Sequence, residues 1–331
     1  MVKTDNTASS AEGISVLYAD DDTDNVRDED TTALKDKIQR EANRSTDWVQ
    51  DNRMVCAGNK TKLLILGTSQ LRKSKVESKN VTFEINVCGS VIKDTKSERL
   101  LGLTVNNQLT WKEYLYGEKW REDDNAVGLV PQLAQRVGIL SKIAKLMPSN
   151  RLKLFCNGLF HSKLSYCIQV FSNVWNITNL DEENRRFAAF TKTDNRKLQI
   201  LQNKVMRLKT GLPRHTSTEL LCRTSGDLSV QQLTAYSSLL SAQKCIYYQK
   251  PEYMAQRLEL RSFEDTEVFP RRQNNTMRIH SRLTLARGGY FYRSAALFNK
   301  LPDEMRSCME PDQFRTKVKM WVKNNIPVKP D

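Results

Sequence analysis

The sequence predicts an α+β protein in which a region of strands comes first and a mainly helical region follows. Two observations support this prediction. Short runs of β-prone or alternating apolar residues lie within the first 110 residues. After Trp111, apolar residues recur at every third or fourth position, which is the spacing of an amphipathic helix. The length of 331 residues exceeds one average domain, so two or three modules with a sizeable core are expected.

The first expected element is a strand at residues 14–18, where the run Ile-Ser-Val-Leu-Tyr leads into a cluster of aspartates at a tight turn. Residues 31–50 predict an amphipathic helix, because apolar residues recur there with helical spacing. A buried strand is expected at residues 63–67. The alternating run at 81–87 and the run at 100–105 predict the two strands of a β-hairpin.

Four helices are expected in the remainder of the chain. The first carries the apolar stripe of Leu133, Val137 and Leu140 and ends at Pro148. The third, at residues 195–209, ends before Gly211, since glycine is the usual residue just after a helix. Polar, irregular stretches at 181–195 and 264–275 are expected to be linkers. The other three helices are expected at residues 150–170, 195–209 and 229–248.

The charge is distributed unevenly along the chain. The net charge is +14, yet the first thirty residues hold nine acids and two bases. A basic body around a tight acidic cluster is typical of a polymerase-like protein, because the body attracts phosphates while the acids hold cations. A generic basic surface with a solvated acidic tail would give the same composition.

Several other features indicate an intracellular protein, cytoplasmic or nuclear, that is not secreted. The N-terminus lacks the apolar core of a secretory signal, and no apolar run is long enough to cross a membrane. Seven widely spaced cysteines argue against a disulfide framework and against a zinc finger. We therefore expect reduced thiols and no membrane partner.

The acidic turn at residues 20–24 allows three interpretations. Carboxylates at the apex of a strand and turn can bind Mg²⁺ together with substrate phosphates. An EF-hand loop would also begin with Asp20, Asp22 and Asp24, but Asn25 stands where glycine is required and Thr31 where a bidentate glutamate is required. A solvated turn with no ligand is the third interpretation.

Residues 16–21, Val-Leu-Tyr-Ala-Asp-Asp, resemble the YADD box of reverse transcriptases from non-LTR, LINE-type retrotransposons. Further stretches similar to segments of these enzymes follow in order over nearly the whole chain. They comprise Trp48, Asn52, Met54, Asn59 and the run Lys60-Thr61-Lys62; Leu101-Gly102-Leu103 and Leu109-Thr110-Trp111; and residues 162–167, 198–204 and 297–302.

This resemblance implies a C-terminal fragment of an RNA-directed DNA polymerase, a nucleotidyltransferase, that begins just before the YADD motif. Residues 1–110 would be an incomplete palm, 111–215 a thumb-like helical region and 216–331 a helical C-terminal region. Two Mg²⁺ ions would be the cofactors, with an RNA template, a DNA primer and a dNTP as partners and no small-molecule cofactor. The implied site residues are Asp20 and Asp21 as catalytic metal ligands, Tyr18 near the primer terminus, and Lys62 and Lys60 near the nucleotide or the primer-template.

The sequence departs from the family pattern at three places. Asp22 intervenes before Thr23, where the family has threonine directly after the two aspartates, and Tyr114 stands where histidine is often found. In the family, the strand with the other catalytic aspartate and the segment that selects the nucleotide precede the YADD turn, and here thirteen residues precede Ile14. We therefore expect the isolated chain to be inactive, and its palm to expose apolar surface and a free strand edge.

Two alternatives remain open: a non-catalytic nucleic-acid-binding module and the product of a decayed retroelement. Trp48 and Trp111 are expected to be core anchors rather than platforms for base stacking. A binding module would use basic helical residues of the thumb region, namely Arg136, Lys142, Lys145, Lys204, Arg207 and Lys209.

Overall fold

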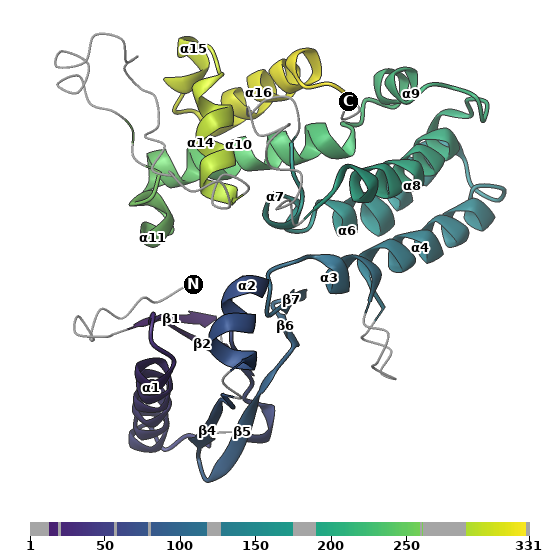
Figure 1. Ribbon diagram of the computed structural model, residues 1–331. Helices are drawn as coiled ribbons and strands as arrows, with labels where there is room; N and C mark the ends of the chain where they lie inside the picture. Colours follow the sequence, from purple (N-terminus) through teal and green to yellow (C-terminus); the bar gives the residue numbers. More distant parts are fainter. Residues whose placement is uncertain are drawn as a thin grey trace. The chain divides into compact units, whose positions relative to one another are not determined.

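The computed structural model describes residues 13–18, 21–55, 58–78, 81–117, 127–174, 190–258, 260 and 289–328, although the side chains of 13–18 lie outside this description (Figure 1). The protein is of the mixed α+β class, as the sequence predicts. It divides into two compact units, one at residues 1–113 and the other at residues 114–331. The small sheets belong to the first unit and most of the helices to the second.

The first unit opens with an antiparallel hairpin of β1 (Gly13–Tyr18) and β2 (Asp21–Val26), followed by α1 (Thr31–Asp51). Asp30 caps α1, because its carboxylate accepts hydrogen bonds from the backbone N–H groups of Thr32 and Ala33. The predicted strand and the predicted helix are thus both present. The aspartates that follow Tyr18 do not all lie in a turn, since those from Asp21 to Asp24 form part of β2.

The predicted hairpin of residues 81–87 and 100–105 is wrong in its pairing. The first run pairs with a strand that directly follows it, at residues 90–95. The run predicted as a strand at 100–105 instead contains the turn of a second hairpin, because Leu101 and Gly102 have positive φ and join two short strands. Cys88 and Gly89 both have positive φ in the two-residue turn that joins the first pair. The pairs are β4 (Glu84–Val87) with β5 (Ser90–Thr95), and β6 (Ser97–Leu100) with β7 (Leu103–Asn106).

The predicted strand at 63–67 is shorter than expected, because β3 comprises only Leu63–Leu64 and pairs in parallel with β5. The apolar face of α1 packs on the core of this unit through Leu34, Ile38 and Ala42. Trp48, on the same helix, is 51% exposed, so the expectation that it anchors the core is wrong. The buried core consists of Leu63, Ile65, Phe83, Ile85, Val87 and Ile92. The short helical turns of the unit are η1 (Gly58–Lys60), α2 (Ser69–Arg72) and η2 (Lys73–Glu77).

The second unit is helical and follows α3 (Lys112–Tyr116), a short helix that spans the division between the units. Three of its long helices, at residues 129–143, 192–210 and 230–248, correspond to predicted ones, and the sequence analysis did not predict the others. Gly211 adopts a left-handed conformation directly after α8, which confirms the predicted stop. These helices are α4 (Leu129–Ile143), α8 (Lys192–Thr210), α9 (Thr218–Ser225), α10 (Val230–Tyr248), α14 (Tyr290–Asn299) and α16 (Pro311–Asn325); short ones are α11 (Glu252–Ala255) and α15 (Asp303–Arg306).

The helix predicted at 150–170 is interrupted rather than continuous. Cys167 has a φ of 52°, and this left-handed residue separates α7 from the preceding helical turns. The interruption turns the chain so that α7 packs against α10. The segment comprises α5 (Ser149–Phe155), the π-helical η4 (Cys156–His161), α6 (Ser162–Ser165) and α7 (Ile168–Phe171).

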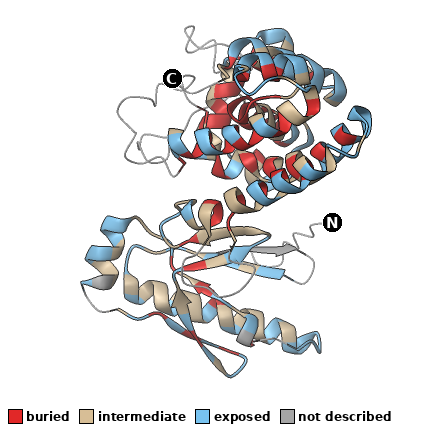
Figure 2. Ribbon diagram, turned by 90° about the vertical axis from the view of Figure 1, so that its right-hand side faces the viewer, coloured by how far each residue is buried: buried red, intermediate tan, exposed pale blue. Residues whose placement is uncertain are grey.

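The core of the second unit lies around α10, which packs against α14, α16, α7 and α8. Figure 2 shows more buried residues in this helical unit than in the first unit. The predicted linker at 181–195 ends in the first turn of α8, so its last residues are helical. Its residues 181–189 and the linker predicted at 264–275 lie outside the described residues. Within the described part of the chain, no helix is long and apolar enough to cross a membrane.

Candidate functional site

The β1–β2 hairpin carries the acidic residues that the sequence singles out. Its register pairs Tyr18 with Asp21, so Ala19 and Asp20 connect the two strands. Asp20 and the side chain of Tyr18 lie outside the described residues. Asp21 is exposed at the first position of β2, and its carboxylate is the one predicted metal ligand that the structure describes.

The two faces of β2 carry different acids. Successive residues of a strand point to opposite faces, so Asp22 and Asp24 share one face and Asp21 points to the other. Ser45 Oγ on α1 donates a hydrogen bond of 2.8 Å to Asp24 Oδ2, so the face of Asp22 and Asp24 is the one that contacts α1, although both residues are exposed. The extra aspartate at position 22 therefore turns away from the face of Asp21.

The environment of Asp22 disfavours its charged form. Desolvation by the surrounding chain raises the pKa of its carboxyl, and the nearby Asp24 carboxylate raises it further. A backbone hydrogen bond from Thr23 and the charge of Arg44 act in the opposite direction without cancelling the shift. Asp22 and Asp24 also lie in an extended strand rather than in a loop, which argues against an EF-hand.

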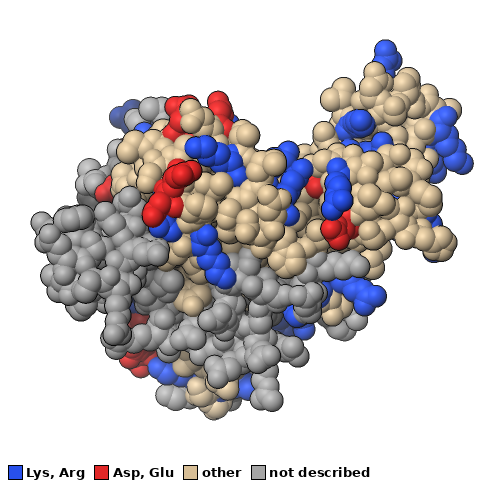
Figure 3. Space-filling view, turned by 90° about the horizontal axis from the view of Figure 1, so that it is seen from above, with Lys and Arg blue, Asp and Glu red and all other residues tan. Residues whose placement is uncertain are grey.

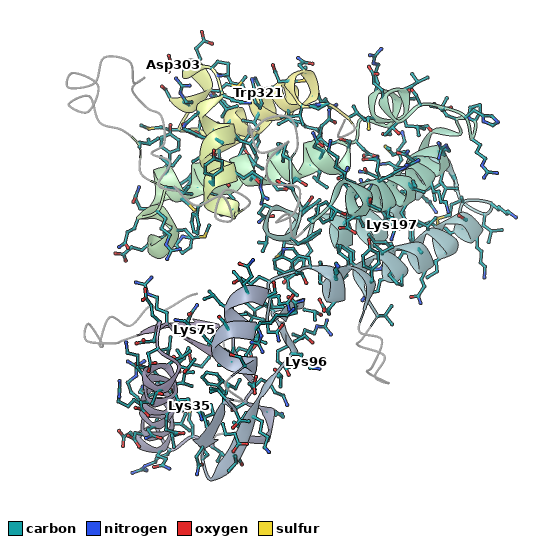
Figure 4. The ribbon with its side chains drawn as sticks, viewed as in Figure 1. Lys35, Lys75, Lys96, Lys197, Asp303 and Trp321 are labelled. Atoms are coloured by element: carbon teal, nitrogen blue, oxygen red, sulfur yellow. The ribbon has the colours of Figure 1, made fainter. Side chains whose placement is uncertain are left out.

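The remaining acids of the cluster stabilise the connection from β2 to α1. Lys37 Nζ lies 2.9 Å from Asp28 Oδ2, and this hydrogen bond is the main cause of the lowered pKa of Asp28. Asp30 caps α1, as described above. Lys75 on η2 donates to the backbone oxygen of Glu29, and Figure 4 shows Lys75 extending from that short helix. These contacts fix the start of α1 relative to the hairpin.

The predicted nucleotide-binding lysines are both exposed. Lys60 ends the 3₁₀ turn η1, and Lys62 immediately precedes β3. Neither forms an ion pair with a residue that the structure describes, and no described contact joins either of them to Asp21. Their assignment to the nucleotide stays a prediction.

The described carboxylates do not form a complete metal site. Among the described residues, no group of three or more histidine, cysteine, aspartate or glutamate side chains could hold a metal ion. Carboxylate oxygens are the kind of ligand that Mg²⁺ prefers, so Asp21 fits this ion in kind. Asp20 lies outside the residues searched, and a further carboxylate would have to come from another segment.

Three of the six basic residues predicted to bind nucleic acid have structural roles in the helical unit. Lys209 is buried, with Nζ 2.8 Å from both carboxylate oxygens of Asp227. Arg136 Nη1 donates to the backbone oxygen of Leu159 at 2.6 Å, and Arg207 donates to that of Thr216 at 3.3 Å. The other three residues are exposed: Lys142, Lys145 and Lys204.

The ion pair of Lys209 and Asp227 is a feature that the sequence analysis missed. His161 Nε2 lies 3.5 Å from Asp227 Oδ2, so α8, η4 and the link before α10 meet at this carboxylate. Burial alone would raise the pKa of Asp227, but the neighbouring His161 and the charge and hydrogen bonds of Lys209 hold it at about 2. No local pattern predicts the pairing, because Lys209 and Asp227 are 18 residues apart and belong to different elements.

Comparisons with models of known protein families, with curated proteins and with solved structures find no match to this chain. The likeness to reverse transcriptases therefore depends on the ordered sequence motifs.

Proposed function

We propose that this chain is the C-terminal part of an RNA-directed DNA polymerase of a non-LTR retrotransposon, and that the β1–β2 hairpin presents its catalytic carboxylates. The observation that supports this proposal is the hairpin register. Pairing of Tyr18 with Asp21 leaves Ala19 and Asp20 as the connection between two strands. A YADD box needs this arrangement, because it must hold two carboxylates at the end of a hairpin where ions and phosphates can reach them.

The residues of this chain would contribute position and charge to such a site. The contacts of Asp24, Asp28 and Asp30 fix the hairpin to α1, so the carboxylate of Asp21 is held on an anchored strand. Two bound Mg²⁺ ions would supply charge stabilisation for transfer of a nucleotide to a primer 3′-hydroxyl. To hold both ions, the site would need Asp20, Asp21 and a third carboxylate from a separate segment.

A nucleic-acid-binding role without catalysis is a second candidate, and the charge of the helical unit favours it. Residues 127–174 contain six lysines and arginines and no acid. Residues 190–228 contain eight bases and three acids, and each of these acids is engaged: Asp194 in a helix cap, Glu219 with Arg223 and Asp227 with Lys209. The net positive charge of this region suits a phosphate backbone.

The first experiment measures Mg²⁺-dependent incorporation of dNTPs on a primed RNA template. It compares the chain, the chain extended by in-frame upstream sequence, and both with Asp20→Ala or Asp21→Asn. Asp36→Ala is the matched control, because Asp36 is an exposed acid on α1 outside the hairpin. We expect the extended chain to be active, with a loss of at least about 100-fold for Asp20→Ala and no loss for Asp36→Ala.

Binding of the same primer-template in EDTA separates the two candidates. The binding-module role predicts salt-dependent binding that falls when Lys142, Lys145 and Lys204 are changed to glutamine, whatever the outcome of the incorporation assay. Failure of every extended chain to incorporate dNTPs, with binding intact, would leave only the binding role. Incorporation that survives Asp20→Ala would contradict the assignment of the YADD carboxylates.

A further inference from the structure

The helical unit carries opposite charges at two places that also expose apolar side chains. The first, here named the basic end, surrounds the connection from α4 to α5. None of its four basic side chains forms an ion pair with a described residue. Leu146 and Leu154 stand among them and are 86% and 71% exposed. The four basic residues are Lys142, Lys145, Arg151 and Lys153.

The basic end is a fixed part of the fold. The backbone N–H of Leu146 donates to Ile143 O at 2.9 Å, and that of Leu152 donates to Pro148 O at 3.0 Å, so both sides of the connection are hydrogen-bonded. Arg136 ties α4 to η4 through Leu159 O. The exposure of Leu146 is therefore imposed by a structured turn, and burying it against a partner would be favourable.

The second place, here named the acidic end, comprises α15 and the start of α16. Residues 302–312 contain four acids and one base, and that base, Arg306, is buried. Glu304 and Glu310 are exposed and have no ion pair among the described residues. Met309 is 70% exposed between them. The other two acids are Asp303 and Asp312, which pair with Arg306 and Arg315.

The acidic end is also anchored. Gln243 on α10 donates to the backbone oxygen of Cys308 at 3.0 Å, and the Tyr247 hydroxyl donates to that of Arg306. Figure 4 shows Asp303 at the outer edge of this end. In the view of Figure 3, most visible acidic side chains lie toward the left, and the right-hand end shows lysine and arginine.

The two ends cannot meet within one copy. Figure 1 shows α15 at one extremity of the helical unit and the C-terminal end of α4 at the other. Both belong to the same compact unit, so the distance between them is fixed by the fold. The two ends have opposite charges, and both expose apolar side chains. Each end therefore attracts the opposite end and repels a second end of its own kind.

We propose that the partner of each end is the opposite end of a second copy of this chain. Such a head-to-tail contact is heterologous, so it closes into a ring or continues as a chain of copies. Lys145 and Lys153 would face Glu304 and Glu310, and Leu146 and Leu154 would cover Met309. The inference is independent of the proposed polymerase function, because it uses no residue of the hairpin.

Sedimentation of the full-length, nuclease-treated chain tests the proposal. The average mass should rise with protein concentration at low salt and fall as salt screens the charges, since the Debye length is about 10 Å at 0.1 M. Lys145→Glu with Lys153→Glu, and separately Glu304→Lys with Glu310→Lys, should each weaken association at least about tenfold. The matched control, Lys244→Glu with Lys250→Glu, changes two exposed lysines elsewhere and should have no effect.

Mixing the two charge-reversed proteins is the decisive step. The first variant would have a neutral end in place of its basic end, because Lys142 and Arg151 remain, and the second would be basic at both ends. Neither should therefore associate alone. The mixture should associate, because the unchanged acidic end of the first variant can pair with the unchanged basic end of the second. A chain that stays monomeric at low salt, or an acidic-end variant that associates like the parent, would overturn the proposal. The proposal would also be overturned if reversing the basic end abolished binding of nucleic acid or anionic vesicles but left self-association unchanged.

Discussion

At the scale of single residues, the side chain of Lys209 shows how a basic residue of a helical stripe can serve the fold. This side chain is only 5% exposed, and its ammonium group makes two hydrogen bonds to Asp227. Asn157 accepts a third at 3.3 Å. A buried ion pair with these extra partners avoids an uncompensated charge, so removing either member should be costly.

We predict that Asp227→Asn lowers the free energy of unfolding by about 3 kcal/mol at pH 7, because it leaves Lys209 buried without its counter-charge. The pKa of Asp227 is about 2 in the folded protein, below its ordinary value. The stability from this lowered pKa is present above about pH 4 and is lost as the pH falls from 4 to 2. Denaturant unfolding of both proteins at pH 7, 4 and 2.5 should show the difference shrink over that window. A difference independent of pH would contradict the prediction.

At the scale of elements, the helices of the second unit begin and end at residues with clear physical roles. Thr191 and Asp194 form a capping box at the start of α8, where each side chain accepts a hydrogen bond from the other residue's backbone N–H. The hydroxyl of Tyr116 also donates to Asp194. Gly211 ends the helix with a φ of 70°, a conformation that favours glycine.

Two glycine substitutions should have opposite effects on the helical unit. Gly138 lies within α4, and a Cβ atom added there would meet no other atom within 4 Å, so Gly138→Ala should stabilise the protein by about 0.5–1 kcal/mol. A Cβ at Gly211 would also meet open space, but its positive φ makes Gly211→Ala unfavourable by about 1 kcal/mol. Thermal unfolding of the two variants measures this. If both substitutions changed the stability by the same amount and in the same direction, backbone conformation would not determine their effects.

At the scale of the whole molecule, the two units have separate cores of different size. Among the described residues, the core of the first unit has six buried residues, whereas one of the core clusters of the second has sixteen. The first unit also exposes large apolar side chains, most of them on helices and loops rather than on a sheet. They include Trp48, Val55, Leu66, Leu71, Val91 and Leu101.

We predict that calorimetry of the full chain shows two unfolding transitions, with the first unit unfolding at the lower temperature. Phe83→Ala should lower the temperature of the first transition only, and Phe314→Ala that of the second only. Each substitution should lower the free energy of unfolding of its own unit by about 3–5 kcal/mol, because the two side chains are fully buried in different cores. A single transition shifted by both substitutions would show that the units unfold as one.

The sequence identified several elements because their signals are local. Helical periodicity located α1, α4, α8 and α10, and a glycine marked the end of α8. It also indicated the strand before Asp20, where β-prone residues precede a turn. These features depend on side chains a few positions apart, so propensity and spacing are enough to predict them.

The tertiary structure decided the features that depend on residues far apart in the chain. It paired β4 with β5 instead of with residues 100–105, and it broke the helix at 150–170 at Cys167 so that α7 could pack on α10. It also buried Lys209 against Asp227, although the helical pattern places that lysine among exposed ones. The sequence by itself determined closely where α1, α8 and α10 begin and end, since each helix closes its own hydrogen bonds. Only the folded chain determined which strands pair and which charges remain on the surface, because those outcomes depend on long-range packing.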